Sequence, residues 1–175
     1  MRPPPPTPPL LLAVRILAQW NSLGLLRGAQ LRLNRPEVWG LAADRRSASA
    51  AGSGAQALVE PFIEGFRKFN SNSGWAGSGT YAGISAALSH YSYHSTSGQL
   101  LLCDLQGGVT ADGAELTDPV VMSSTERFGP MDYGMKGIRN FFAHHVCNEW
   151  CGKKGWTLPK NCERLFAPRE GTMTK

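Results

Sequence analysis

Three side chains that bind transition metals lie close together near the end of this chain. His145, Cys147 and Cys151 form the pattern H-x-C-x3-C. Imidazole nitrogen and thiolate sulfur are donors that Zn²⁺ prefers, and a structural zinc ion is normally held by four protein ligands in a closed site. Because such an ion fixes separate parts of a chain around one point, this pattern constrains the fold more strongly than any other feature of the sequence.

The apolar spacing around the pattern predicts a helix over residues 134–151, ended by Gly152. On that helix Cys147 and Cys151 share a face, one turn apart, whereas His145 lies round the side. A fourth ligand must then come from elsewhere in the chain. The candidates are the other histidines: His90 first, then His94 and His144. The spacing alone also fits two ordinary buried cysteines beside a surface histidine.

The composition predicts one mixed domain rather than a helical bundle. With 175 residues, of which 42% are hydrophobic, the chain can bury a core, and its 20 glycines and 12 prolines predict many turns. No apolar run reaches the ~18 residues that a membrane-spanning helix needs, so we expect no membrane span. The apolar periodicity predicts an α+β fold with helices over 10–26 and 81–92, strands over 57–63 and 99–105, and a loop over 107–115.

The basic character of the chain is confined to its first third. Residues 1–59 hold seven arginines and two acids, a net charge of +5, whereas residues 60–175 hold eleven basic and eleven acidic residues. A nucleic-acid surface needs a basic face on the folded body, so we expect no nucleic-acid partner. The proline-rich start and its arginines also fit a transit peptide, but we favour an ordinary amphipathic helix and a cytoplasmic location.

Two acids and an amide follow the second predicted strand. Asp104 lies near the end of that strand, Gln106 comes two residues later, and Asp118 lies in the motif LTDP. Carboxylate and amide oxygens suit Mg²⁺, an ion that is commonly shared with the phosphates of a substrate. An aspartate at a strand end is, taken alone, more often a residue that caps a turn.

Together these segments resemble the alpha-type (atypical) protein kinases, the family of the myosin heavy-chain kinases, the elongation-factor kinases and the kinase tails of certain ion channels. The resemblance runs in order through residues 57–151. The motifs that carry it are VEPFIEG (59–65), FRKFNSNSGW (66–75), ALSHYSY (87–93), LLLCDLQG (100–107), LTDP (116–119), FGPMDYGMKGIRNFF (128–142) and HHVCNEWC (144–151).

The resemblance implies a bilobal fold that binds ATP, Mg²⁺ and a structural zinc ion and transfers the γ-phosphoryl group of ATP to serine or threonine of a protein. By position it assigns phosphoryl transfer to Asp104, with Asn72 beside it, and magnesium to Gln106 and Asp118. The zinc ligands that it implies are His90, His145, Cys147 and Cys151. The nucleotide-binding residues that it implies are Glu60 and Phe62 in the hinge and Gly129, Gly134 and Gly137 in a glycine-rich loop near the cleft and the peptide substrate.

The chain departs from the family on its amino-terminal side. The family's small lobe carries a strand lysine that contacts the ATP phosphates, but residues 1–59 contain no lysine, and the first one, Lys68, lies beyond the hinge. The segment between the two strand-end acids is also longer than in the family. We therefore expect weak phosphoryl transfer, and the alternative is a zinc-stapled pseudokinase that binds protein partners.

The same departure suggests how the chain is divided. We expect residues 1–56 to hold a proline-rich start, a helix and an Ala/Ser/Gly-rich linker over 45–56, together a partial remnant of the small lobe. Residues 57–155 then form the large lobe, and residues 156–175 a C-terminal tail.

Overall fold

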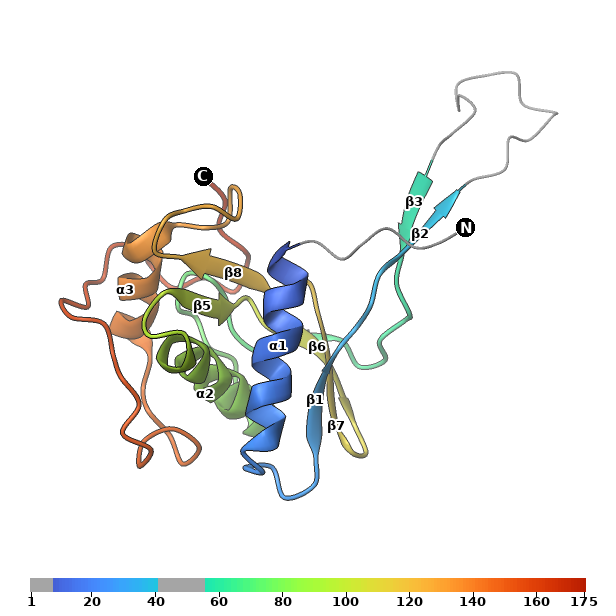
Figure 1. Cartoon of the computed structure of the whole chain (residues 1–175), viewed down its shortest axis with the longest axis horizontal. Coiled ribbons are helices and arrows are strands. Elements are labelled where there is room, and N and C mark those ends of the chain that lie inside the picture. The colour runs from blue at the N-terminus through green and yellow to red at the C-terminus, as the bar shows by residue number, and fades with distance from the viewer. Residues whose placement is uncertain (1–7, 41–55) are drawn as a thin grey trace.

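The structure, a computed structural model, describes residues 8–40 and 56–175 (Figure 1). The helices of this part are α1 (Pro8–Ser22), α2 (Thr80–Ser95) and α3 (Gly134–His144). Its strands are β1 (Gln30–Leu33), β2 (Glu37–Gly40), β3 (Gln56–Val59), β4 (Arg67–Lys68), β5 (Leu100–Cys103), β6 (Gln106–Thr110), β7 (Gly113–Thr117) and β8 (Val120–Ser123). The α+β class predicted from the sequence is confirmed.

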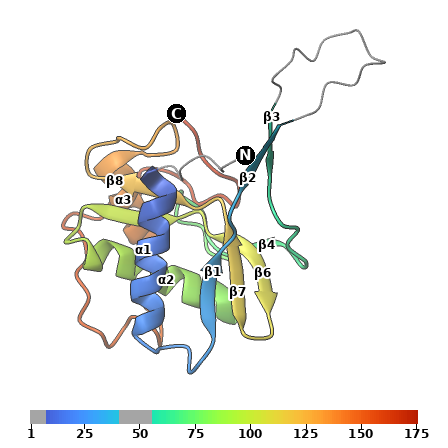
Figure 2. The same cartoon turned by 45° about the vertical axis from the view of Figure 1, so that its right-hand side comes forward.

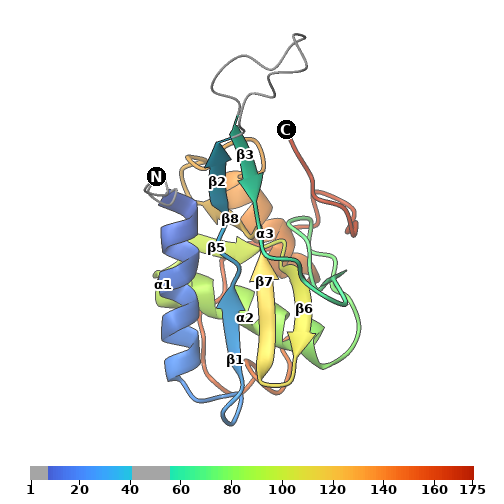
Figure 3. The same cartoon turned by 90° about the vertical axis from the view of Figure 1, so that its right-hand side faces the viewer.

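Three sheets connect these elements. The largest has the strand order β1-β7-β6-β4, in which β1 runs parallel to β7 and the other pairs are antiparallel. Strand β5 pairs antiparallel with β8, and β2 pairs antiparallel with β3. Figure 3 shows β1, β7 and β6 side by side with α1 along the outer side of β1. The β2–β3 pair extends away from the body of the molecule, as Figure 2 also shows.

Helix α1 joins the amino-terminal segment to the main core. The helix predicted over 10–26 is present but ends at Ser22, two residues before Gly24, whose φ of +65° is left-handed. One face of the helix is buried in a cluster shared with β1, α2, β5 and β7. That face consists of Ala13, Ile16, Leu17 and Trp20. The division of the chain at residue 56 stays a prediction, and the linker over 45–56 lies outside the described residues apart from Gln56, which begins β3.

Strand β5 lies between two buried clusters. Leu100 and Leu102 pack into the cluster that contains α1, whereas Leu101 and Cys103 pack into a second cluster with β8 and α3. Successive side chains of a strand point to opposite faces, so a strand with both faces covered becomes a continuous apolar run. This explains why residues 99–105 could be predicted as a strand, and it places Asp104 at the end of the most buried strand.

The segment 107–115, predicted as a loop, forms most of the hairpin β6–β7. Thr110 and Gly113 are the last paired residues, and the turn lies between them. The prediction was wrong because it treated glycine as a sign of a loop. A Cβ on Gly108 would collide with the backbone oxygen of Glu64, so glycine is needed here for a close approach of two backbones.

The helix predicted over 134–151 ends at His144, so Gly152 is not its end. His145 is already extended, and its N–H donates to the Phe141 carbonyl at 3.0 Å, which closes the last turn of α3. The Asn148 side chain then accepts a hydrogen bond from the Trp150 N–H at 3.1 Å. Asparagine that bonds to nearby backbone in this way competes with helix formation.

Residues 152–175 form no helix or strand, yet they are held against α3. The N–H groups of Leu165 and Phe166 both donate to the Asn140 side-chain oxygen at 2.8 Å, and the Phe166 ring packs on Tyr133 at 5.3 Å. The tail therefore follows a defined path along the helix. In the described part of the chain, no helix is long and apolar enough to cross a membrane.

Candidate active site and metal centre

Asp104 and Asp118 each follow a strand and share an uncommon backbone conformation. Asp104 follows β5, is 2% exposed and has a φ of +59°. Asp118 follows β7 and has a φ of +43°. Aspartate adopts this left-handed region more readily than most side chains, and such residues cluster at functional sites. Each of these two strands is therefore followed directly by an aspartate in a left-handed backbone conformation.

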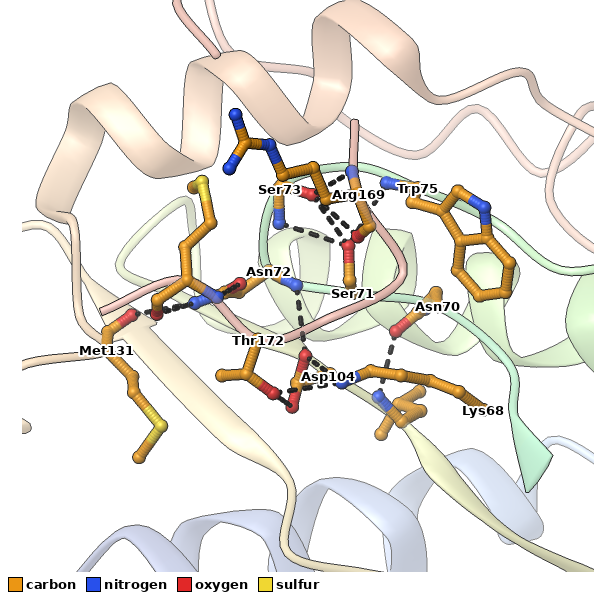
Figure 4. A network of polar contacts seen from close by, with 12 residues as sticks. Lys68, Asn70, Ser71, Asn72, Ser73, Trp75, Asp104, Met131, Arg169 and Thr172 are labelled. Atoms are coloured by element: carbon orange, nitrogen blue, oxygen red, sulfur yellow. Dashed lines mark hydrogen bonds and ion pairs between the residues drawn. The ribbon is translucent and has the colours of Figure 1, made fainter. Parts of the chain in front are cut away.

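Three donors surround the Asp104 carboxylate (Figure 4). Lys68 Nζ lies 2.8 Å from Oδ1, in an ion pair whose side chains are 11% and 2% exposed. The Asn72 N–H donates to Oδ1 at 3.3 Å, and the Thr172 hydroxyl donates to Oδ2 at 2.6 Å. Charges removed from water interact more strongly than a surface pair does. Asp104 and Asn72, predicted to lie beside each other, are therefore in contact.

The sheet register brings Gln106 to the same cluster. Gln106 of β6 is paired with Lys68 of β4 on one side and with Thr117 of β7 on the other. Directly paired residues point to the same face of a sheet, so the Gln106 side chain lies between those two. The Thr117 hydroxyl donates to Glu60 Oε2 at 2.6 Å, which fixes the hinge to the end of β7.

Asp118 is a further carboxylate near Asp104 and Glu60. Partial burial raises the pKa of Asp118, and the charges of Glu60 and Asp104 raise it further. Carboxylates that disfavour one another's ionisation are relieved by a cation between them. Two acids and an amide have the donor chemistry that suits a magnesium ion, and the assignment of magnesium to Gln106 and Asp118 stays a prediction.

The hinge borders an open cavity of about 530 Å³ on the β6–β7 hairpin. Phe62, which is 92% exposed, and Ile63 line one side, and Gly108 and Glu115 line another. A cavity of this volume with an aromatic side chain and accessible backbone can accept a planar ring. Of the two predicted hinge residues, Phe62 borders this cavity, whereas the Glu60 side chain accepts a hydrogen bond from Thr117.

Of the three predicted loop glycines, Gly137 is required by packing, and Gly134 is favoured by its left-handed backbone conformation. Gly134 has a φ of +63°, and a Cβ there would lie 2.5 Å from the Glu126 side chain. A Cβ on Gly137 would collide with the Met122 sulfur. Gly129 lies in open space and is exposed, so nothing but its backbone conformation restricts that position.

Asp132 holds this loop to β8 and was not predicted as a site residue. It is fully buried and accepts four hydrogen bonds. The donors are the N–H groups of Ser123 (2.9 Å), Gly134 (3.0 Å) and Phe128 (3.2 Å) and the Ser123 hydroxyl (2.7 Å). A carboxylate bound by several donors in this way is a rigid anchor.

The C-terminal segment crosses the site. Both backbone groups of Met173 bind the Asn72 side chain: the N–H donates to Oδ1, and Nδ2 donates to the carbonyl, each at 2.8 Å. Ser73 Oγ binds Arg169 in the same manner, at 2.8 Å from its N–H and 3.0 Å from its carbonyl. In the sequence Thr172 lies between Arg169 and Met173, and Figure 4 shows its hydroxyl directed at Asp104.

Sequence reasoning missed two members of this site. Lys68 was noted only as lying beyond the hinge, although its place in the motif FRKFNSN, four residues before Asn72, was an available signal. Thr172 lies in a tail with no recognisable motif, so nothing local pointed to it.

The predicted metal ligands converge at one point. Donor atoms of His90, His145, Cys147 and Cys151 all lie within 4.8 Å of one another. Cys147 Sγ lies 3.6 Å from His90 Nδ1 and 3.7 Å from His145 Nε2, and Cys151 Sγ lies 3.7 Å from the same Nε2. Ligands on one tetrahedral zinc ion at ~2.0–2.3 Å lie roughly 3.3–3.8 Å apart, so these separations fit.

The competing histidines lie elsewhere. His94 Nδ1 lies 3.3 Å from the Thr157 hydroxyl, and His144 Nε2 lies 3.2 Å from the Phe166 carbonyl. His90 is therefore the fourth member of the cluster. Because α3 ends at His144, the segment that carries the two cysteines can turn back toward His90.

Burial prepares the two imidazoles for a metal. It lowers the pKa of His90, and burial together with the neighbouring His90 lowers the pKa of His145 to about 4. Both rings are therefore neutral at pH 7, the form that binds metal. Burial raises the pKa of Cys151 to about 11, so a metal bound here must displace the thiol proton.

A protein-family model described as the Alpha-kinase family matches residues 12–151. The chain is 40% identical to alpha-protein kinase vwkA of Dictyostelium discoideum over 103 residues, which are 58% of this chain and 16% of that protein. It is 34% identical to human eukaryotic elongation factor 2 kinase over 99 residues, 55% of this chain and 13% of the relative. It is 41% identical to human transient receptor potential cation channel subfamily M member 7 over 104 residues, which are 54% of this chain and 5% of that protein. The chain thus matches a small part of each relative's length.

Solved structures agree with these sequence matches. The inactive alpha-kinase domain of myosin heavy chain kinase A in complex with ATP aligns with a TM-score of 0.64 and 26% identity, over 81% of this chain and 53% of that one. An alpha kinase from Entamoeba histolytica aligns with a TM-score of 0.68 and 22% identity, over 94% of this chain and 65% of that one. At that identity the second match supports the fold alone.

Proposed function

Because this chain belongs to the alpha-kinase family, we propose that it transfers the γ-phosphoryl group of ATP to serine or threonine of a protein. The observation that carries the proposal is the contact of the buried Asp104 carboxylate with Lys68 and with the Asn72 N–H. Family membership supports a protein kinase function and does not favour the pseudokinase alternative.

Phosphoryl transfer requires little covalent chemistry from the protein, because it depends mainly on the positioning of the reacting groups and on charge stabilisation. Asp104 is suited to orient an acceptor hydroxyl and take its proton. Lys68 offsets negative charge at the same carboxylate. Gln106 and Asp118 are the residues that would hold magnesium, which supplies charge neutralisation at the phosphates.

The hinge and the glycine-rich loop would hold the nucleotide and the substrate. Phe62 and the cavity beside it are suited to the adenine ring, and Glu60 ties the hinge to Thr117 beside the magnesium residues. The glycine-rich loop from Gly129 to Gly137 would border the peptide, because the Met131 carbonyl accepts a hydrogen bond from Asn72 at 3.4 Å. The ATP complex of a similar alpha-kinase domain supports ATP as the phosphoryl donor.

Zinc would have a structural role. Two imidazoles and two thiols would fill all four positions of the ion and leave none open for chemistry. The four cysteines of the described residues form no disulfide. Free thiols beside a metal-binding set are typical of a reducing compartment, which supports a cytoplasmic location.

The proposal is tested by transfer of labelled phosphate from ATP to a basic peptide with a single threonine, in the presence of Mg²⁺. We expect weak transfer by the wild-type chain and its loss in Asp104→Ala. The matched control is Asp112→Asn, because Asp112 is an exposed aspartate at the far turn of the β6–β7 hairpin. Wild-type protein that contains zinc and binds ATP but transfers nothing would instead be the pseudokinase.

A further inference from the structure

We infer that Glu115, in the cavity beside the hinge, accepts hydrogen bonds from the ribose hydroxyls of ATP, so that this chain selects its nucleotide by the sugar. The inference rests on the proposed function, which leaves open what the cavity recognises besides a planar ring. It also gives a role to the segment between Asp104 and Asp118, whose length departs from the family and which forms the β6–β7 hairpin.

The first argument is the face of the sheet on which Glu115 lies. Glu115 of β7 is paired with Gly108 of β6, and Thr117, two residues later, is paired with Gln106. Successive side chains of a strand point to opposite faces, so Glu115 and Thr117 share a face and lie about 7 Å apart along the strand. Leu116, between them, is buried in the core on the other face. The polar face therefore continues from the predicted magnesium residue Gln106 to the cavity.

The second argument is that the cavity is lined by hydrogen-bond acceptors. Its lining includes the carboxylates of Glu64 and Glu115 and no basic side chain. Asn34 also lines it and is only 4% exposed; its Nδ2 donates to the Pro61 carbonyl at 3.0 Å, whereas no residue in the described part of the chain donates to its Oδ1. An ionised carboxylate can only accept hydrogen bonds. The cavity therefore needs a ligand that supplies donors.

The cation nearest to Glu115 in the sheet is directed elsewhere. Arg32 of β1 is paired with Glu115, but its guanidinium donates to both oxygens of Asp112, at 3.0 and 2.7 Å. A bidentate pair of this kind fixes the orientation of the guanidinium plane. The Glu115 carboxylate makes no ion pair with the residues that the structure describes, so its acceptor sites are available to a ligand.

The third argument is which part of the nucleotide supplies donors. The base and the two ribose hydroxyls of ATP carry donors, whereas its phosphates are anions that two carboxylates repel. The nucleoside end would therefore enter the cavity, with the phosphates directed along the polar face toward Gln106 and Asp118. Carboxylates bind ribose hydroxyls in the same way in dinucleotide-binding folds. With the base beside Phe62, the sugar is the part of ATP that Glu115 is suited to bind.

The test compares the binding of ATP with that of 2′,3′-dideoxy-ATP, which lacks both hydroxyls, to the full chain in Mg²⁺ by isothermal titration calorimetry. A hydrogen bond to a charged group changes affinity by roughly 10–100-fold, so we expect the wild type to bind ATP more tightly by such a factor. Glu115→Ala should lose this factor for ATP and bind dideoxy-ATP like the wild type. Glu163→Ala, at an exposed position outside the cavity, should keep the preference.

A second variant separates loss of the contact from loss of the fold. Glu115→Gln has nearly the same shape but no charge and a single acceptor oxygen. We expect it to keep the unfolding temperature of the wild type and to lose most of the preference for ATP. The wild-type ratio is decisive even if a variant fails to fold, because equal affinities for the two nucleotides overturn the inference.

Binding and transfer together separate this inference from the proposed function. A preference for ATP that depends on Glu115 supports the inference, even if no phosphate reaches a peptide. A preference that both Glu115 variants keep, or no preference in the wild type, overturns the inference and leaves the proposed function standing where transfer occurs. A wild-type chain that binds neither nucleotide overturns both.

Discussion

The Thr172 hydroxyl lies 2.6 Å from the Asp104 carboxylate, which joins the end of the chain to the end of a buried strand 68 positions earlier. The path between them runs through the metal cluster at Cys151 and along α3, where Asn140 holds the Leu165 and Phe166 N–H groups. The metal centre and the tail are therefore consecutive parts of one connection. A change at the cluster should alter how the tail is seated as well as how stable the domain is.

Replacement of Lys68 tests what its positive charge contributes to phosphoryl transfer and to stability. Lys68→Met leaves the buried Asp104 carboxylate without its cation, and loss of one such stabilising group commonly lowers transfer ~10²–10³-fold. It should also destabilise the fold by roughly 3 kcal/mol, because an unpaired buried charge remains. Labelled-ATP transfer and urea unfolding measure the two effects.

The controls for this prediction are Lys160→Met and a double variant. Lys160 is exposed, so Lys160→Met should match the wild type in both assays. Lys68→Met combined with Asp104→Asn removes both charges and should regain stability without regaining activity. Wild-type transfer by Lys68→Met would show that the ion pair has no part in the reaction.

Two cysteines test the metal centre, one that belongs to the metal cluster and one that lies outside it. Wild-type protein should contain about one equivalent of zinc, and Cys151→Ser should lose it, because serine is a poor zinc ligand. Loss of the ion should lower the unfolding temperature by roughly 10 °C or more, at about 2–4 °C per kcal/mol for a domain of this size. Metal analysis and thermal unfolding are the measurements.

Cys162→Ser is the matched control for the metal centre. Cys162 is exposed and its thiol donates to the Pro159 carbonyl at 3.3 Å, outside the cluster. This variant should keep its zinc and its stability. Folded wild-type protein without zinc, or equal zinc content in both variants, would contradict the assignment.

Sequence alone could predict the features that local patterns encode. The run from Leu100 to Cys103 is apolar without a break, and this gave the central strand and the position of Asp104 at its end. The H-x-C-x3-C pattern gave three members of the metal cluster, and the family resemblance selected His90 over two other histidines. Each of these depends on residues that are close in sequence or that follow a known motif.

Features set by long-range pairing could not be predicted. The position of Lys68 beside Asp104 follows from the pairing of Lys68 with Gln106, which no local pattern reveals. The contact of Thr172 with Asp104 depends on the whole path of the tail. The end of α3 was also missed, because the apolar period continues past His144 while the ligands and Asn148 require an extended chain.

Asp132 offers a prediction on the glycine-rich loop. Its buried carboxylate accepts four hydrogen bonds, and Asp132→Asn replaces one acceptor oxygen by a donor that faces other donors. We expect a loss of about 2–3 kcal/mol in the free energy of unfolding. Urea unfolding measures it, and Glu163→Gln, at an exposed position, should show no change. A stability of Asp132→Asn equal to the wild type would mean that the loop does not depend on this carboxylate.

The ion pair between Arg32 and Asp112 predicts how stability varies with pH. Arg32 donates two hydrogen bonds to Asp112, at 3.0 and 2.7 Å, and so ties β1 to the turn of the β6–β7 hairpin. Hydrogen bonds from Arg32 and then from Thr110 lower the pKa of Asp112 to about 2. In an unfolded chain the value is ~3.9. The folded value is the lower one, so the stabilisation is fully present above about pH 4 and is lost as the pH falls through about 2.

Asp112→Asn should therefore have a lower urea midpoint than the wild type near neutral pH, and the difference should shrink once the pH falls below about 4. High salt should also shrink it, because the pair is exposed and is screened by ions. Loss of metal in acid affects both proteins alike, so the difference between their midpoints isolates the ion pair. A difference that stays constant from neutral pH to well below pH 4 would show that Asp112 stabilises the turn through its shape or its bond to Thr110 rather than through its charge.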